Sequence, residues 1–239
     1  MPEISIAFQT DKTPAQYVAL AQLVDRYDFD AVSVYCDAPF HPSYGPLLLM
    51  APHIRRARLG PAAVSPSRMQ PVDIAADTAL LASLAPGGAY LGIARGAWLE
   101  DHGVTEGNRP IQAIRETIGI ARQILSGASG GYAGEIYRIA PHVRAPYPLP
   151  TAPVPVMIGS WGKKLCALAG ELADEVKVRG SANPDVIAVI QGYIAEGEVA
   201  AGRELGSTRV VLGAVTVVDE DLAAARQAAR EAAVLYLPV

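Results

Sequence analysis

The stretch "VPVMIGSWGKKLCALAGELADEVKV", residues 154–178, contains a complete strand–helix–strand pattern. The apolar run VPVMI (154–158) is followed by a glycine, as expected of a buried strand, and EVKV (175–178) is a second strand candidate. Between them, residues 161–172 have apolar side chains at helical spacing. Two strands that are joined through a helix lie parallel in one sheet. The stretch therefore predicts a parallel α/β fold.

The same pattern recurs along the rest of the chain. Further strands are predicted at 4–8, 31–36, 58–64, 89–94 and 209–218, and further helices after Thr13-Pro14, near 43–56, 71–84 and 110–126, from Asn183-Pro184, and from Asp219 to about Tyr236. Residues 127–153 interrupt the pattern with two adjacent glycines and five prolines. We interpret this segment as a small excursion outside the sheet.

Seven strand–helix repeats fit either an open doubly wound sheet or a (β/α)8 TIM barrel. The barrel is favoured, because no GxGxxG follows the first strand. We expect one domain over residues 1–239 that lacks the last β/α unit, since no eighth strand follows the helix from Asp219. On this interpretation the chain is shortened or C-terminally truncated, with a gap or strained seam between its first and seventh strands.

Composition narrows the class of partner. The chain has 24 acidic and 20 basic residues and no run of lysines or arginines, which argues against nucleic-acid binding. No apolar run is long enough to span a bilayer, and Cys36 and Cys166 lie too far apart in sequence to suggest a disulfide framework. We expect a cytoplasmic protein that binds a small molecule, with no membrane partner and no metal site.

In a barrel, chemistry gathers at the carboxyl ends of the strands. The residues that this rule selects are Phe8, Gln9, Cys36, Asp37, His41, Ala62, Ala63, Ser65, Ala94, Arg95, Gly96, Gly159, Ser160, Trp161, Gly162, Lys177 and Arg179. The bend at 159–162, with two lysines after it, suits a phosphate, because glycine lets backbone come close and helix starts attract anions. The alternative is an ordinary strand-to-helix turn with two solvated lysines.

Three segments resemble a known family. They are LGPAAVSPSRMQP (59–71), YLGIARGAW (90–98) and the region 154–184, which continues the opening stretch to SANP. Together they are similar to the luciferase-like flavin and deazaflavin oxidoreductases, and within them to the branch that contains methylenetetrahydromethanopterin reductase. The resemblance implies a (β/α)8 barrel that holds the deazaflavin coenzyme F420 or, alternatively, FMN.

The resemblance also assigns cofactor residues. The phosphate would lie on the backbone of Gly96, Ala97, Gly159, Ser160, Trp161 and Gly162. A non-prolyl cis peptide is implied between Ala62 and Ala63, where it would form a bulge behind the ring; a plain strand end is the alternative. Asp37 and Ser65 are implied to contact the ring.

Catalytic groups are fewer than in the family. Asp37 matches an acid near the ring and the substrate, and His41 could replace the histidine that usually follows it, which is Ala38 here. Two further family acids correspond to Ala7 and Ala97, so the proton donor is open. Gln9, Arg95 and Arg179 are substrate-binding candidates; for the two arginines, a solvated rim position is the alternative.

The predicted activity is hydride transfer between F420 or a flavin and an unidentified small organic substrate. Two alternatives stay open, a monooxygenase that uses reduced FMN and a shortened flavin-binding relative without turnover. The helices near 43–56 and 71–84 are more apolar than one inward-facing stripe requires, and the resemblance likewise implies a homodimer through them.

Overall fold

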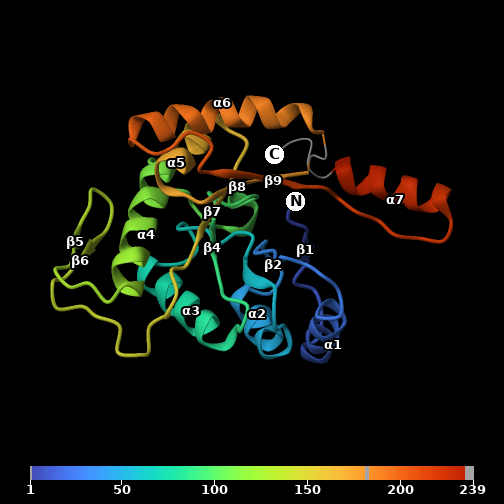
Figure 1. Cartoon of the computed structure of the whole chain (residues 1–239), viewed down its shortest axis with the longest axis horizontal. Helices are drawn as coiled ribbons and strands as arrows, with labels where there is room; N and C mark the ends of the chain where they lie inside the picture. Colours follow the sequence, from blue (N-terminus) through green and yellow to red (C-terminus); the bar gives the residue numbers. More distant parts are fainter. Residues whose placement is uncertain (1, 181–182, 235–239) are drawn as a thin grey trace. The chain divides into compact units, whose positions relative to one another are not determined.

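The computed structural model describes residues 2–180 and 183–234 of the chain. The chain divides into two compact units, residues 1–157 and 158–239 (Figure 1). The prediction of one domain over the whole chain stays a prediction. No described helix is long and apolar enough to cross a membrane.

The first unit is built on parallel strands that follow one another in chain order. Its strands are β1 (Ser5–Phe8), β2 (Ala31–Val34), β3 (Arg58–Pro61) and β4 (Leu91–Ile93). In the sheet, β2 lies between β1 and β3, with Ser5 opposite Ala31 and Ala31 opposite Arg58. Parallel bridges at Leu59–Ala89 and Val64–Ile93 attach the chain around β4 to β3. In a doubly wound sheet the first strand lies inside the sheet, with the third or the fourth strand on its other side, whereas here β2 lies between β1 and β3; this order excludes that alternative.

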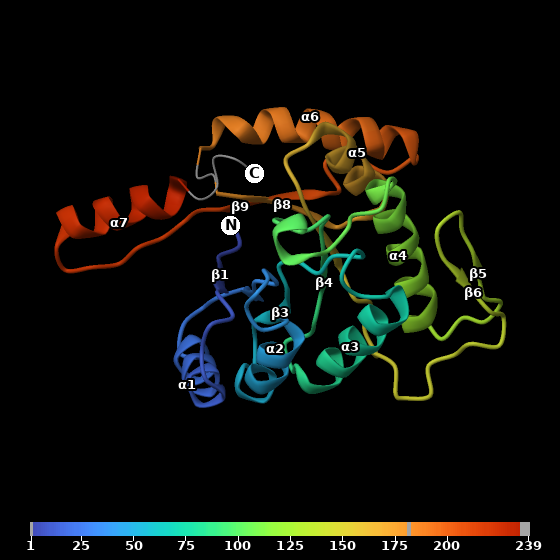
Figure 2. The same cartoon turned by 180° about the vertical axis from the view of Figure 1, so that it is seen from behind.

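Helices alternate with these strands. They are α1 (Pro14–Val24), α2 (Tyr44–Met50), the short 3-10 helix η1 (Ala51–His53), α3 (Pro71–Leu84), η2 (Glu100–His102) and α4 (Pro110–Leu125). Figures 1 and 2 show α1, α2, α3 and α4 side by side in chain order. Thr13 caps α1 as predicted, and its side chain accepts the Gln16 N–H at 3.4 Å.

The core of the first unit lies between these helices and the strands. Fully buried side chains come from α2, β3, α3 and α4 and include Leu47, Met50, Leu59, Ile74, Leu81 and Ile120. Such packing fixes the strand ends relative to one another within this unit, because protein interiors deform little.

The excursion predicted at 127–153 contains a small antiparallel hairpin, β5 (Tyr132–Ala133) and β6 (Arg138–Ile139). Figures 1 and 2 both show it beside α4. It leads to β7 (Val156–Gly159), and the Leu91 N–H of β4 donates to the Pro155 carbonyl at 2.9 Å.

The second unit contains α5 (Lys163–Leu172), β8 (Glu175–Arg179), α6 (Asp185–Ala200), β9 (Arg209–Gly213) and α7 (Leu222–Val234). Strands β8 and β9 are parallel, with Glu175 opposite Arg209 and Arg179 opposite Gly213. Helices α5 and α6 approach closely at Gly197, where a Cβ atom would lie 1.8 Å from the Ala167 carbonyl oxygen. Only glycine permits this contact.

The structure shortens several predicted elements. The strands predicted at 31–36, 58–64 and 89–94 are Ala31–Val34, Arg58–Pro61 and Leu91–Ile93, and the helix predicted near 43–56 is α2 followed by η1. The strand predicted over 209–218 ends at Gly213, which lies opposite Arg179 at the end of β8. The predicted end of the last helix near Tyr236 lies outside the described residues. The strand pairings of the described residues do not join β1 to β9, so they do not close a barrel.

Candidate functional site

The ends of β1 and β2 carry three predicted residues, Gln9, Asp37 and His41. Gln9 is half-buried, and its Oε1 accepts the Thr10 N–H at 3.1 Å. Asp37 is also half-buried and precedes a cis peptide between Ala38 and Pro39. His41 is exposed, but its backbone N–H donates to the Thr10 carbonyl at 3.1 Å. The two loops are therefore joined through main-chain contacts rather than through the imidazole.

The end of β3 has the backbone that the family resemblance implies. The peptide between Ala62 and Ala63 is cis, and both residues are half-buried. The Ala62 N–H donates to the Val34 carbonyl at 2.8 Å, which ties this segment to the end of β2.

Ser65 and Gly96 lie against each other at the ends of β3 and β4. The buried Ser65 hydroxyl donates to the Arg95 carbonyl. Gly96 has a φ of 101°, and a Cβ there would lie 2.9 Å from Leu99 Cδ2 and 3.1 Å from Ser65 Oγ. The contact requires glycine on both grounds. Ala97, the next residue, is half-buried.

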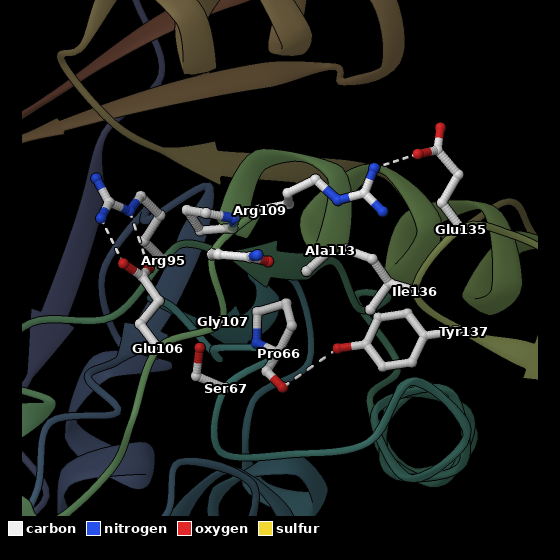
Figure 3. A pocket seen from close by; sticks show the side chains of 12 residues that line it. Pro66, Ser67, Arg95, Glu106, Gly107, Arg109, Ala113, Glu135, Ile136 and Tyr137 are labelled. Carbon is white, nitrogen blue, oxygen red and sulfur yellow. Dashed lines mark hydrogen bonds and ion pairs between the residues drawn. The ribbon is translucent and has the colours of Figure 1, made fainter.

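A pocket of about 310 Å³ lies within the first unit, next to Ser65 and Gly96 in sequence (Figure 3). Its apolar wall is formed by Pro66, Pro110, Ala113, Ile136 and Tyr137. Its polar side chains are Ser67, Arg95, Glu106, Asn108, Arg109 and Glu135. This volume is at the lower end of the range for small-ligand sites, roughly 300–1,000 Å³.

Two ion pairs lie on opposite sides of the pocket (Figure 3). Arg95 binds Glu106 with two hydrogen bonds, Nε to Oε1 at 2.9 Å and Nη2 to Oε2 at 2.5 Å. Hydrogen bonding to Glu106 raises the pKa of Arg95, so the guanidinium stays charged. On the other side, Arg109 pairs with Glu135 through Nη1.

Tyr137 lines the pocket near Pro66. Its hydroxyl donates to the Pro66 carbonyl at 3.4 Å. Burial raises the pKa of Tyr137, so the phenol stays neutral and available as a donor.

A buried carboxylate holds the hairpin that carries Glu135 and Tyr137. Glu116 of α4 is 1% exposed. It accepts the backbone N–H groups of Glu135, Ile136 and Tyr137 at 2.8, 3.0 and 2.8 Å, and the Gln112 side-chain amide at 2.8 Å. Burial works to raise the pKa of Glu116, but these hydrogen bonds together lower it below its ordinary value.

Sequence analysis selected Arg95 but missed Arg109, Glu116, Glu135 and Tyr137. Arg109 and Glu135 pair across 26 positions, between two segments that the strand-end rule does not cover. The only available signal was a glutamate within the apolar pattern of the helix predicted at 110–126. Burial of a charged residue at such a position indicates hydrogen-bonding partners from elsewhere in the chain.

In the second unit, the turn Gly159–Gly162 has two of its amides engaged. The Ser160 N–H donates to the Lys177 carbonyl at 3.1 Å, as a continuation of strand pairing. The Gly162 N–H donates to Ser160 Oγ at 3.0 Å. The Ser160 and Gly162 amides are therefore already bonded within the protein.

The turn nevertheless fits a phosphate at its helix end. A Cβ at Gly162 would have no neighbour closer than Ser160 Oγ at 3.8 Å, so the space beside Gly162 is open. Trp161, at 43% exposure, leads into α5, which begins at Lys163. A phosphate there would replace the Ser160 hydroxyl as the acceptor for the Gly162 amide.

The two lysines after this turn differ from each other in their contacts. Lys163 pairs with Glu196 at 2.7 Å and lies over the Tyr193 ring, whereas Lys164 is exposed. Arg179 ends β8, but its side chain lies outside the described residues. The predicted cofactor residues are thus divided between the two units, Ala62, Ala63, Ser65, Gly96 and Ala97 in the first and 159–162 in the second.

The sequence was compared with models of known protein families. A model of the family described as luciferase-like monooxygenase matches residues 2–238. The chain belongs to this family. The features that led to it, the segments around Ala62-Ala63, Gly96 and Gly159, are all within the matched range.

The curated relatives are oxidoreductases by name, and some of the names include F420. A 5,10-methylenetetrahydromethanopterin reductase from Archaeoglobus fulgidus is 31% identical over 189 residues, which cover 78% of this chain and 55% of the relative. An F420-dependent glucose-6-phosphate dehydrogenase from Kineococcus radiotolerans is 30% identical over 181 residues, covering 73% of this chain and 53% of the relative. The chain therefore spans little more than half the length of these curated relatives.

A solved luciferase-like structure supports the fold. The coenzyme F420-dependent tetrahydromethanopterin reductase from Methanopyrus kandleri superposes with a TM-score of 0.85 at 24% identity, covering 95% of this chain and 70% of that one. This likeness confirms the predicted α/β fold of the TIM-barrel type, although the strands here do not close.

Proposed function

We propose that the protein is an oxidoreductase that transfers a hydride between coenzyme F420 and a small organic substrate. The observation that carries this proposal is that a relative named as an F420-dependent glucose-6-phosphate dehydrogenase is 30% identical over 73% of this chain, and a methylenetetrahydromethanopterin reductase is 31% identical over 78%. The small residues at the ends of β3 and β4 and the open space beside Gly162 are compatible with it.

In this proposal the residues of the chain bind and orient the cofactor. Ala62, Ala63 and Ser65 contact the ring, and the backbone at 96–97 and 159–162 binds the phosphate. Bound F420 supplies a carbon centre, C5, that accepts or donates a hydride. The protein contributes position, charge and exclusion of water.

Asp37 is the proposed proton-handling residue, because it is half-buried at a strand end and has an ionisable side chain. His41 is the second candidate, although its exposure makes it the less shielded of the two. Ala7 and Ala97 cannot move a proton. We therefore expect the substrate to need few protein acids, and we propose that Gln9, Arg95 and Arg179 contribute to its binding.

Two alternatives belong to the same family. A monooxygenase would use reduced FMN and oxygen. The family whose model matches the chain is described as luciferase-like monooxygenase. A flavin-binding relative without turnover would bind a cofactor but leave it unchanged.

Titration of the purified full chain with F420 and with FMN separates the first two functions. We expect F420 to bind more tightly, as measured by quenching of its fluorescence. Tighter binding of FMN, together with substrate-dependent oxygen consumption by the reduced form, would instead establish the monooxygenase.

Turnover separates an enzyme from a binding protein. Reduced F420 is mixed with a panel of small carbonyl and enone acceptors, and the return of the oxidised cofactor is followed by absorbance. Oxidation that depends on both protein and acceptor supports the proposal. Asp37→Asn, which lacks the proposed proton-handling group, is compared with the unchanged chain. Tight binding without any acceptor-dependent oxidation would favour the non-catalytic alternative.

A further inference from the structure

The pocket beside Arg95 has the features of a site for an organic anion. It is enclosed entirely by residues of the first unit, between Pro66 and Tyr137. Its position follows from the neighbouring contact, because Ser65 binds the Arg95 carbonyl and both chain segments continue into the pocket wall. The pocket therefore adjoins the strand ends to which we assign the cofactor ring.

The two ion pairs of the pocket differ in how easily a ligand can displace the glutamate from its arginine. Glu106 is 21% exposed and holds Arg95 with two parallel hydrogen bonds. Arg109 and Glu135 are 50% and 62% exposed, and one hydrogen bond joins them. Exposed pairs of this kind contribute little to stability. A ligand carboxylate can therefore replace Glu135 on Arg109 at little cost.

The unused hydrogen-bond donors of the pocket and the start of α4 favour an anion over a cation. The two arginines and the two glutamates cancel, but each guanidinium has donors beyond those used in its pair. Glu106 is held on Arg95 by both of its carboxylate oxygens, so it is the less easily displaced of the two glutamates. In addition, α4 begins at Pro110 in the same wall and has no acidic residue in its first turn. The start of a helix stabilises negative charge.

The remaining wall selects a small apolar body. Pro66, Ala113 and Ile136 offer apolar surface, and the Tyr137 ring offers a flat face. The hairpin carrying Ile136 and Tyr137 is fixed by Glu116 through its backbone. The Glu135 side chain can thus move while the wall stays in place.

We propose that this pocket binds the organic substrate through a carboxylate or phosphate group on a small apolar body, with Arg109 as the anion ligand. In the free protein the Glu135 carboxylate occupies the position of the ligand's anionic group. That the ligand is the substrate rests on the proposed function; the binding itself does not, and it can be measured without cofactor.

The test uses the full chain without cofactor and four probes with one ring and different charges. Benzoate and phenyl phosphate are the anions, benzyl alcohol is neutral, and benzamidine is a cation; binding is measured by saturation-transfer NMR and calorimetry. We expect the two anions to bind and the other two not to bind. Benzamidine or benzyl alcohol binding as tightly as benzoate would overturn the proposal.

Two variants identify the residues. Arg109→Gln should weaken benzoate binding about tenfold, the effect of losing a charge-assisted hydrogen bond. Glu135→Gln should strengthen it by up to about fivefold, because the competing carboxylate is gone. A gain in affinity cannot result from misfolding. Arg138→Gln, an exposed arginine outside the pocket lining, is the charge-matched control. An equal loss in Arg138→Gln, or no gain in Glu135→Gln, would contradict the assignment.

F420 titration of the same variants separates this proposal from the proposed function. We expect Arg109→Gln to keep its F420 affinity and to lose affinity for the anionic probe. If Arg109→Gln loses F420 affinity and F420 displaces benzoate, the pocket holds the acidic tail of the cofactor, and the substrate assignment is wrong. If the unchanged chain binds benzoate but not F420, the proposed function fails and the anion site stands.

Discussion

The Glu116 carboxylate accepts the backbone N–H of Tyr137 at 2.8 Å, across 21 positions of the chain. Through this bond and those to Glu135 and Ile136, one buried side chain of α4 fixes the turn of the β5–β6 hairpin. The hairpin in turn provides one wall of the pocket. A helix residue that contacts no ligand thus positions the residues that we assign to ligand binding.

The first prediction concerns stability. Glu116→Ala leaves three backbone N–H groups without their acceptor, so we expect the free energy of unfolding to fall by about 2–4 kcal/mol. Urea denaturation at neutral pH measures this change. Glu100→Ala, which alters an exposed glutamate of the same unit, should change it by less than about 0.5 kcal/mol. Equal effects of the two variants would show that the Glu116 hydrogen bonds contribute nothing specific.

Acid should weaken the fold through two carboxylates. In the second unit, buried Glu198 accepts the Gly206 and Thr208 N–H groups, each at 2.8 Å, in the same manner as Glu116. For both groups burial works to raise the pKa, and the hydrogen bonds outweigh it, so the folded-state pKa lies below the ordinary 4.5. A carboxyl with a lowered folded-state pKa stabilises the fold above its unfolded-state pKa. This contribution is lost as the pH falls through the folded-state value.

We therefore expect the free energy of unfolding to be level near neutral pH and to fall progressively below about pH 5. Urea titrations over this range provide the measurement. The variant Glu116→Gln/Glu198→Gln should be less stable at neutral pH and should lose less stability on acidification. A double variant with the same acid-dependent loss as the unchanged chain would assign that loss to other groups.

The alternation of strands and helices was predictable from sequence because apolar periodicity and turn residues are local signals. The helix predicted at 71–84 has those limits in the structure. The seven repeats alone left the strand order open between a barrel and a doubly wound sheet, and the structure supplies the order β1-β2-β3. The end of β9 was not predictable, since Val218 belongs to an apolar run by sequence yet is 91% exposed. Strand length depends on the partner strand, which a local pattern does not contain.

The candidate site was predictable only where residues follow strands. Arg95 and Ser65 were selected by that rule, and both contribute to the contact beside the pocket. Arg109 and Glu135 were not, because their pairing depends on how the excursion at 127–153 folds back on the start of α4. Glu116 was missed for the same reason: its partners are backbone amides, which no side-chain pattern reveals.

Gly159→Val tests the phosphate assignment. A branched side chain at this turn would fill space that we assign to the cofactor phosphate, so we expect F420 affinity to fall about tenfold or more while the fold is retained. Fluorescence titration gives the affinity, and circular dichroism reports the fold. Gly192→Val is the control, because a Cβ at this exposed helical glycine meets nothing within 4 Å. Unchanged F420 affinity in Gly159→Val would refute the phosphate site.

Asp37→Asn tests proton handling. The substitution keeps the shape of the side chain and removes its ionisable group, so we expect turnover to fall about 10²-fold, a usual effect of losing a general acid or base. Cofactor affinity should change little, which a fluorescence titration checks. His41→Gln should have a smaller effect, because His41 is exposed. Full activity in Asp37→Asn would remove this residue from the mechanism.

The last prediction concerns assembly through α2 and α3. Both helices bury one face, yet Leu49, Leu80 and Leu84 are 39%, 49% and 40% exposed. Leu80 and Leu84 are four positions apart and therefore share one face of α3. Exposed leucines grouped in this way are a usual feature of protein interfaces.

We expect a homodimer at micromolar concentration, and Leu80→Glu/Leu84→Glu should make it monomeric, because two charges would be buried without partners. Light scattering after size-exclusion chromatography gives the mass. Leu222→Glu, at a 62% exposed leucine of α7, should leave the dimer intact. A monomeric mass for the unchanged chain would contradict the dimer, and dissociation by Leu222→Glu alone would place the interface elsewhere.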